Sequence, residues 1–176
     1  NVSGLLGLPT GARVSSVFNP QRNRSTGAGI FQVTVAGTGI TAATNRMVLT
    51  DNGLGVTAIA RTGLPLTALD NLAPSAYLDV LERPSDNRIS LSYRLAGAAL
   101  GEDTGVLGID HTGMVTDAAL REGNTLMAGG FVGQIVHCAE GNGASIAVAK
   151  WIPSVGQPAV DSLYVNNVRA PVAQGT

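Results

Sequence analysis

Apolar and polar residues alternate along several short stretches of the chain, and these stretches recur in a fixed order. The clearest set lies between Asn87 and Gly123. It comprises an alternating run at Ile89–Leu95, an apolar run at Val106–Ile109, a turn at Asp110–Gly113 and a third run at Met114–Leu120. A period of two places successive side chains on opposite faces of the backbone. Each run therefore predicts a β-strand with one buried face.

The same order occurs once before this set and begins again after it. The earlier copy contains Ile30–Val35, Met47–Leu49, the turn Asp51-Asn52-Gly53, Val56–Ala60 and Gly63. The later copy contains Ala144–Trp151, Leu163–Val165 and Val168–Gly175. The Asn-Gly pair of the earlier turn predicts a type I′ hairpin, because these residues readily adopt the positive φ that such a turn requires.

Each copy also has a twelve-residue segment that ends in asparagine. The three segments are Ala12–Asn23 (ARVSSVFNPQRN), Ala76–Asn87 (AYLDVLERPSDN) and Phe131–Asn142 (FVGQIVHCAEGN). They align without gaps, which predicts a fourth strand with its exit turn in every copy. In the second segment, Pro74-Ser75 and the spacing of Ala76 and Leu81 also suit a short helix. The comparison of the copies favours a strand there.

These patterns predict an all-β chain that forms one β-repeat domain over residues 1–176. The final asparagines lie 64 and 55 residues apart, so each four-stranded unit has about 59 residues. The units span about 24–87, 88–142 and 143–176, and the third unit is completed by residues 1–23. Four short strands in such a length are typical of a β-propeller blade.

The split third unit predicts how the chain assembles. A closed ring of only three blades would be strained, so we expect the two half-units to meet between chains. Residues 1–23 would then add a strand to the incomplete unit of a neighbouring copy, a familiar route to assembly. The residues expected at this junction are Val14, Val17, Phe18, Leu163, Val165, Val168 and Val172.

The stretches that follow each asparagine resemble a known bacterial family. They are Asn23–Phe31, Asn87–Leu91 and Asn142–Val148. They are similar to the tandem repeats of the choice-of-anchor group, which are built around Asn-x-x-Gly-x-x-Ala-Phe and occur in exported proteins. The later Ala-Arg-x-Gly-x-Pro feature of that family looks like Ala60–Pro65 and Leu120–Gly123. The resemblance implies an extracellular, propeller-like and non-enzymatic protein.

Composition restricts the classes of partner. The 176 residues include 11 Lys and Arg against 12 Asp and Glu, so the net charge of −1 argues against nucleic acid or an anionic membrane as the main partner. No apolar run reaches the roughly 18 residues that span a bilayer. Only 13% of the residues are charged, which favours an extracellular or cell-surface location. The chain starts at Asn1 and not at methionine, so we expect a processed chain or a piece of a longer protein.

Few side chains are candidates for chemistry. His137 lies beside the single cysteine, Cys138, but neighbours in a strand point to opposite faces, which predicts a packed thiol and an outward imidazole. Asp110 and His111 share a turn, while Asp51 lies in another unit, so a metal site is not expected. Nucleotide-binding and Gly-x-Ser-x-Gly motifs do not occur. We therefore expect no catalytic, metal or cofactor site.

The function hypothesis is a structural protein that assembles with copies of itself into a filament or ring. The alternative is a propeller-type binding module for a glycan or surface protein. Asn1-Val2-Ser3 and Asn23-Arg24-Ser25 match the glycosylation acceptor pattern. The aromatic residues Trp151, Tyr93, Tyr77 and Tyr164 are too sparse for a sugar-stacking platform, and packing between units is the commoner explanation.

Overall fold

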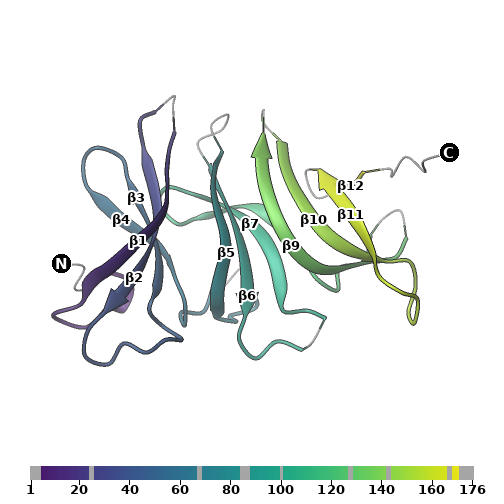
Figure 1. Cartoon of the computed structure of the whole chain (residues 1–176), viewed down its shortest axis with the longest axis horizontal. Coiled ribbons are helices and arrows are strands. Elements are labelled where there is room, and N and C mark those ends of the chain that lie inside the picture. The colour runs from purple at the N-terminus through teal and green to yellow at the C-terminus, as the bar shows by residue number, and fades with distance from the viewer. Residues whose placement is uncertain are drawn as a thin grey trace.

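The chain consists of three β-sheets that stand side by side in chain order (Figure 1). The computed structural model describes residues 5–23, 26–66, 69–83, 88–99, 101–126, 129–141, 144–165 and 168–170. Over these ranges the chain has twelve strands, a 3-10 turn η1 (Leu5–Gly7) and no α-helix. The prediction of an all-β chain is confirmed.

Every sheet contains four antiparallel strands, each hydrogen-bonded to the next in the chain. The first sheet comprises β1 (Arg13–Arg22), β2 (Gly29–Ala36), β3 (Arg46–Asp51) and β4 (Val56–Arg61). The second comprises β5 (Pro74–Arg83), β6 (Arg88–Leu95), β7 (Thr104–Asp110) and β8 (Val115–Arg121). The third comprises β9 (Phe131–Gly141), β10 (Ala144–Ile152), β11 (Val160–Val165) and β12 (Val168–Arg169). The predicted strand at Pro74–Arg83 is thus confirmed over the helical alternative.

The twelve-residue segments form the first strand of each sheet and not the fourth. In the first sheet, Val14 and Val17 of β1 lie opposite Val35 and Val33 of β2. The prediction that residues 1–23 complete the unit at 143–176 is therefore wrong, and the sheets group residues 13–61, 74–121 and 131–169. Only a few residues separate each segment from the strand that follows it. Closing such a short connection costs less chain entropy than bringing the distant ends of the chain together.

The hairpin between β3 and β4 forms at the predicted place but with a different turn. Gly53 has a φ of 84°, whereas Asn52 does not adopt positive φ, so the turn is not type I′. Two side chains stabilise the loop. The Asp51 carboxylate accepts a hydrogen bond from the Gly53 amide (2.8 Å), and the Asn52 side-chain oxygen accepts one from the Leu54 amide (3.0 Å).

The equivalent hairpin between β7 and β8 is also organised by an aspartate. The Asp110 carboxylate accepts hydrogen bonds from the Thr112 amide (2.8 Å), the Thr112 hydroxyl (2.6 Å) and the Met114 amide (3.0 Å). Partial burial acts the other way, but these bonds stabilise the ionised form and lower the pKa of Asp110. Both turns therefore depend on an acidic side chain at the end of the third strand.

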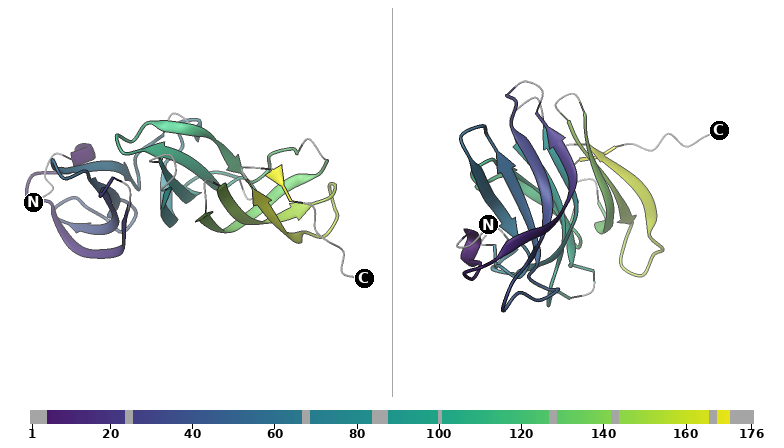
Figure 2. Two further views of the ribbon diagram at one scale, coloured as in Figure 1. Left: turned by 90° about the horizontal axis from the view of Figure 1, so that it is seen from above. Right: turned by 60° about the vertical axis from the view of Figure 1, so that its left-hand side comes forward.

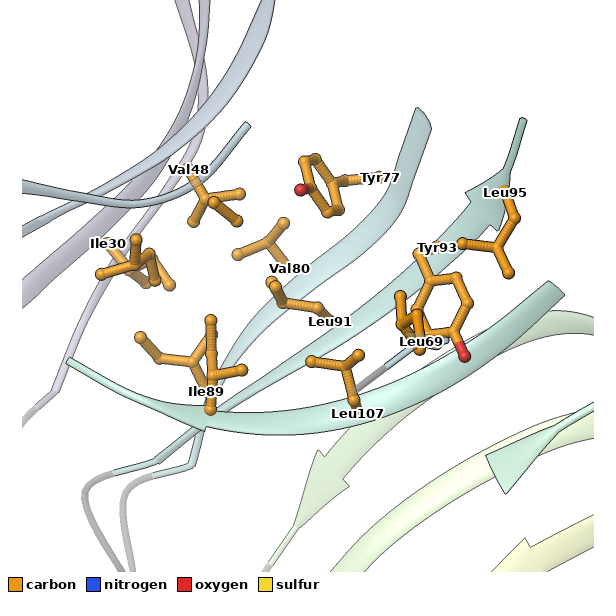
Figure 3. Packing of buried hydrophobic residues seen from close by; sticks show 13 residues of the cluster. Ile30, Val48, Leu69, Tyr77, Val80, Ile89, Leu91, Tyr93, Leu95 and Leu107 are labelled. Carbon is orange, nitrogen blue, oxygen red and sulfur yellow. The ribbon is translucent and has the colours of Figure 1, made fainter. Parts of the chain in front are cut away.

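Successive sheets pack face to face, and each sheet therefore has two apolar faces. We call the face that is turned toward the following sheet the front face, and the opposite one the back face. In the third sheet, the front face is the one turned away from the second sheet. Ile30 and Val48, on the front face of the first sheet, pack against Ile89, Leu91 and other residues on the back face of the second (Figure 3). The cluster comprises Ile30, Val48, Ile59, Ala60, Leu69, Tyr77, Val80, Ile89, Leu91, Tyr93, Leu95, Leu107 and Ile109.

The same arrangement joins the second and third sheets. Val106 lies on the opposite face of β7 from its neighbour Leu107 and belongs, with Leu120, to a cluster on the front face of the second sheet. This cluster includes Ala147, Ala149 and other residues on the back face of the third sheet. The full set is Val106, Leu120, Val132, Ile135, Cys138, Ala147, Ala149 and Tyr164.

The back face of the first sheet is covered by residues Leu5–Ala12, which we call the N-terminal cap. Leu8 and Ala12 of this cap are 4% and 0% exposed, and they share a cluster with Val33 and Met47. The Arg61 guanidinium at the end of β4 donates a hydrogen bond to the carbonyl of Leu6 (3.0 Å). The cap therefore buries Val33 and Met47 on this side of the row, whereas Val17 on the edge strand β1 stays exposed.

Each following sheet approaches the preceding one mainly through its first strand. β5 lies near β1, β2 and β3 of the first sheet, and β9 lies near β5, β6, β7 and β8 of the second. The first and third sheets lie at opposite ends of the row in Figure 1 and in the left-hand view of Figure 2. The described strands thus form an open row.

Candidate functional site

A cluster of polar groups joins the second sheet to the third. Asp79 on β5 accepts a hydrogen bond from the Ser92 hydroxyl (3.1 Å) and another from the backbone amide of Cys138 (3.1 Å). The Ser92 hydroxyl oxygen in turn accepts one from the Asp79 amide (2.8 Å). Nδ1 of His137 lies 3.8 Å from the same Asp79 carboxylate. The cluster brings together serine, aspartate and histidine residues that the sequence analysis did not connect.

This arrangement does not match a nucleophilic triad. Ser92 is fully buried, and its hydroxyl proton is directed to the Asp79 carboxylate and not to an imidazole. In a triad, the histidine removes the proton of the serine while the carboxylate orients the histidine. The His137 side chain is 73% exposed, whereas Cys138 is buried. The predicted outward imidazole and packed thiol are confirmed, and the cluster acts as a structural link between sheets.

A second link runs through Thr104, which is fully buried at the start of β7. Its hydroxyl donates to a Glu122 carboxylate oxygen (2.8 Å) and accepts a hydrogen bond from the backbone amide of Ile135 on β9 (3.0 Å). Burial, together with repulsion from Asp103, raises the pKa of Glu122 despite the stabilising bond from Thr104. Thr104 therefore holds the Glu122 carboxylate in place, although burial disfavours its ionised form.

Glu122→Gln is expected to change how stability depends on pH. A carboxyl group with a raised pKa in the folded state binds its proton more tightly there than in the unfolded chain. Its contribution is therefore favourable at low pH and declines as pH rises from its ordinary value of 4.5 through the raised value. The glutamine side chain carries no charge, so the stability advantage of the variant over the wild type should grow between about pH 4 and pH 7.

Urea unfolding of both proteins at several pH values measures this difference. Titrations of the other acidic groups, apart from Asp103, cancel in the comparison. A difference that stays constant or shrinks as pH rises would contradict the assigned direction.

The turns that carry Asp51 and His111 are closer than the sequence predicted. They belong to different sheets, but the Thr50 hydroxyl donates to the backbone carbonyl of His111 (3.3 Å). Within the ranges that the structure covers, no group of three or more His, Cys, Asp or Glu side chains is placed to hold a metal ion. The contact between the turns is a packing contact.

Asn23 is a poor acceptor for a glycan in the folded chain. The residue is fully buried, and its side-chain oxygen accepts a hydrogen bond from the Thr26 amide (3.0 Å). A glycan on this side chain would have to displace these contacts. Asn1, the other predicted acceptor, lies outside the described residues.

The aromatic residues are used for packing. Tyr77, Tyr93 and Tyr164 are 8%, 1% and 0% exposed, and burial raises the pKa of Tyr93 to about 12. The Arg169 guanidinium stacks over the Trp151 ring, 3.5 Å from its centroid. These four residues therefore offer no open platform for stacking sugars, in agreement with the packing explanation.

The front face of the third sheet carries exposed apolar side chains that no other sheet covers in the described structure. Val148 on β10 lies directly opposite Leu163 on β11, and the two are 38% and 42% exposed. Ile146 lies opposite Val165 in the same pair of strands. We call Ile146, Val148, Leu163 and Val165 the end-face cluster. The same faces of the first two sheets are buried by a following sheet.

The predicted assembly residues do not come together within the chain. Val14, Val17 and Phe18 lie on β1 in the first sheet, where Val17 is 57% exposed and the Phe18 ring contacts the Arg46 guanidinium. Leu163, Val165 and Val168 lie in the third sheet, at the far end of the row. Leu163 and Val165 are in the end-face cluster, Val168 pairs with Val165 and is 68% exposed, and Val172 lies outside the described residues.

Comparison of the chain with protein-family models, with curated proteins and with solved structures gives no significant match. Among the described residues, no helix combines the length and the apolar character that a membrane span requires.

Proposed function

We propose that the protein is a non-catalytic structural protein of the cell surface or extracellular space, in which three propeller-type repeat units form a scaffold that assembles with copies of itself. The exposed front face of the third sheet carries this proposal. The first and second sheets bury the same face against a following sheet, whereas Val148 and Leu163 remain accessible.

The route of assembly differs from strand addition by residues 1–23. In the described structure β1 is the first strand of its own sheet, where it pairs with β2, and β12 pairs with β11 as the last strand of the third sheet. Contact between sheet faces uses a geometry that the chain repeats internally. Face-to-face packing of sheets also buries side chains without requiring open backbone groups.

The polar clusters support a structural role. Asp79 and Thr104 use their side chains to hold β9 against the second sheet through the backbone amides of Cys138 and Ile135. The low share of charged residues and the resemblance to exported tandem-repeat proteins support a location outside the cytoplasm.

The mass of the native particle tests this proposal. Sedimentation and light scattering over a range of concentrations should detect species heavier than the 17.9 kDa chain. A particle that keeps the mass of one chain at every concentration would overturn self-assembly as the function.

A second candidate is a binding module for a glycan or protein, which the apolar tips of two hairpins favour. Leu54 and Met114 are 95% and 64% exposed in the turns that follow β3 and β7. These turns belong to adjacent sheets and are linked through Thr50 and His111. Binding on a glycan array that is lost in Leu54→Ser and Met114→Ser would favour this candidate, and an array without hits would count against glycan binding.

A further inference from the structure

The end-face cluster has the composition of an internal surface of this protein. The first sheet presents Ile30 and Val48 to the second sheet, and the second presents Val106 and Leu120 to the third. On the third sheet, Val148 and Leu163 project from the face opposite to buried Ala149 and Tyr164. Aliphatic side chains on a sheet face are stabilised when a second sheet about 10 Å away removes them from water.

We propose that this face binds the same face of a second copy of the chain, which gives a closed dimer with two-fold symmetry. The inference rests on the proposed function and specifies its partner and its geometry. Two-fold dimers bring the same surface of both copies together and are the commonest symmetric assembly.

The N-terminal cap argues against continued stacking in one direction. A filament would require the front face of the third sheet to contact the back face of the first sheet in the next copy. Leu8 and Ala12 already cover Val33 and Met47 on that back face, which are each 1% exposed, so that only its β1 edge at Val17 stays open. The end face is therefore the surface that two copies can share without displacing a folded segment.

The charges around the cluster are compatible with a self-complementary contact. Lys150 lies opposite Asp161 on the same pair of strands, and the two side chains form an ion pair next to Val148 and Leu163. The pair carries no net charge, so two copies can approach without like-charge repulsion. Around a two-fold axis, each lysine can also approach the aspartate of the other copy.

The size of the face predicts a weak dimer. Three strands about 4.8 Å apart, with roughly six to eight residues each at about 3.3 Å per residue, cover roughly 300–400 Å² of sheet per copy. This area, roughly 600–800 Å² for the two copies together, is smaller than that of standard specific interfaces, so we expect a transient dimer with a dissociation constant of at least about 10 micromolar.

A charge introduced into the apolar contact tests the dimer. Leu163→Glu would place a carboxylate in the contact of both copies, so we expect the dissociation constant measured by sedimentation to rise by about 100-fold. The matched control is Leu54→Glu, which introduces the same charge at a side chain that is 95% exposed on a hairpin of the first sheet. The control should dimerise like the wild type. Circular dichroism checks that both variants keep their β-structure.

A cross-linking variant provides an independent readout if Leu163→Glu unfolds. A residue near a two-fold axis faces the same residue of the other copy. Leu163→Cys should therefore give a disulfide-linked dimer under oxidising conditions and no cross-linked species larger than a dimer. Cys138 is buried and should not compete, and Leu54→Cys should remain largely uncross-linked.

The outcomes separate this inference from the proposed function. A wild-type particle of two chains that is lost in Leu163→Glu and kept in Leu54→Glu supports the end-face dimer. A filament, a larger ring or a dimer unaffected by Leu163→Glu would overturn the inference while leaving self-assembly in place. A monomer at all concentrations would overturn both, and the partner of the end face would then be a different protein.

Discussion

Replacing Gly105 by alanine is expected to lower the free energy of unfolding by about 3 kcal/mol, because the new methyl group has no space on β7. Gly105 lies directly opposite Tyr93 on the neighbouring strand. A Cβ atom at this position would overlap the Tyr93 hydroxyl and ring and would lie 2.9 Å from the carbonyl oxygen of Leu120. The Tyr93 ring is 1% exposed within the core between the first two sheets, so it cannot move aside freely.

A double-mutant cycle separates this overlap from a general cost of alanine at that site. Tyr93→Leu removes the ring and leaves room over Gly105, so the cost of Gly105→Ala should be smaller in that background by at least about 1 kcal/mol. Urea unfolding of the four proteins gives the coupling. Equal costs of Gly105→Ala in both backgrounds would show that the Tyr93 ring does not occupy this space.

The strand positions could be predicted from the sequence because alternation depends only on which residues face the core. The stretches at Ile89–Leu95 and Ile30–Val35 became β6 and β2 with small shifts at their ends. The partners of the strands were harder to predict. Ala12–Asn23 has the same alternation whether it pairs with the strand after it or with a distant one, and only its hydrogen bonds to β2 distinguish the two.

The candidate surface left a partial signal in the sequence. Ile146 and Val148 alternate with Ala147 and Ala149, so both faces of this strand are apolar, which is typical of a strand placed between two layers. That pattern indicates a second contact surface but not its partner. The links from Asp79 to Cys138 and from Thr104 to Ile135 left no such signal, because they join residues of different sheets through backbone amides.

The Ala-Arg-x-Gly feature has a structural role that its spacing did not reveal. Arg61 and Arg121 occupy the ends of β4 and β8, the last strands of the first two sheets. Arg61 donates to the carbonyl of Leu6, and Arg121 donates to the carboxylate of Asp70 (2.8 Å). In both cases the arginine binds the segment that precedes its own sheet, so the feature ties each sheet to its entering chain.

Arg61→Met is expected to cost about 3 kcal/mol, because two charge-assisted hydrogen bonds from a buried guanidinium are lost. Arg61 is 8% exposed and donates through Nε to the Thr44 carbonyl and through Nη1 to the Leu6 carbonyl, both at 3.0 Å. Methionine keeps the apolar stem but leaves these carbonyls without the donor. Urea unfolding measures the loss, and limited proteolysis should show faster cleavage within the N-terminal cap.

Arg121→Met is the matched control, and its cost should be only about 1 kcal/mol, because its ion-pair partner is exposed to water. Asp70 is 81% exposed, and the second bond of Arg121, to the Glu102 carbonyl, is longer at 3.3 Å. Equal losses in the two variants would contradict the role assigned to the buried bonds of Arg61.

A loosened cap would also uncover Val33 and Met47 on the back face of the first sheet. Arg61→Met should therefore form assemblies larger than the proposed wild-type dimer, whereas Arg121→Met should not.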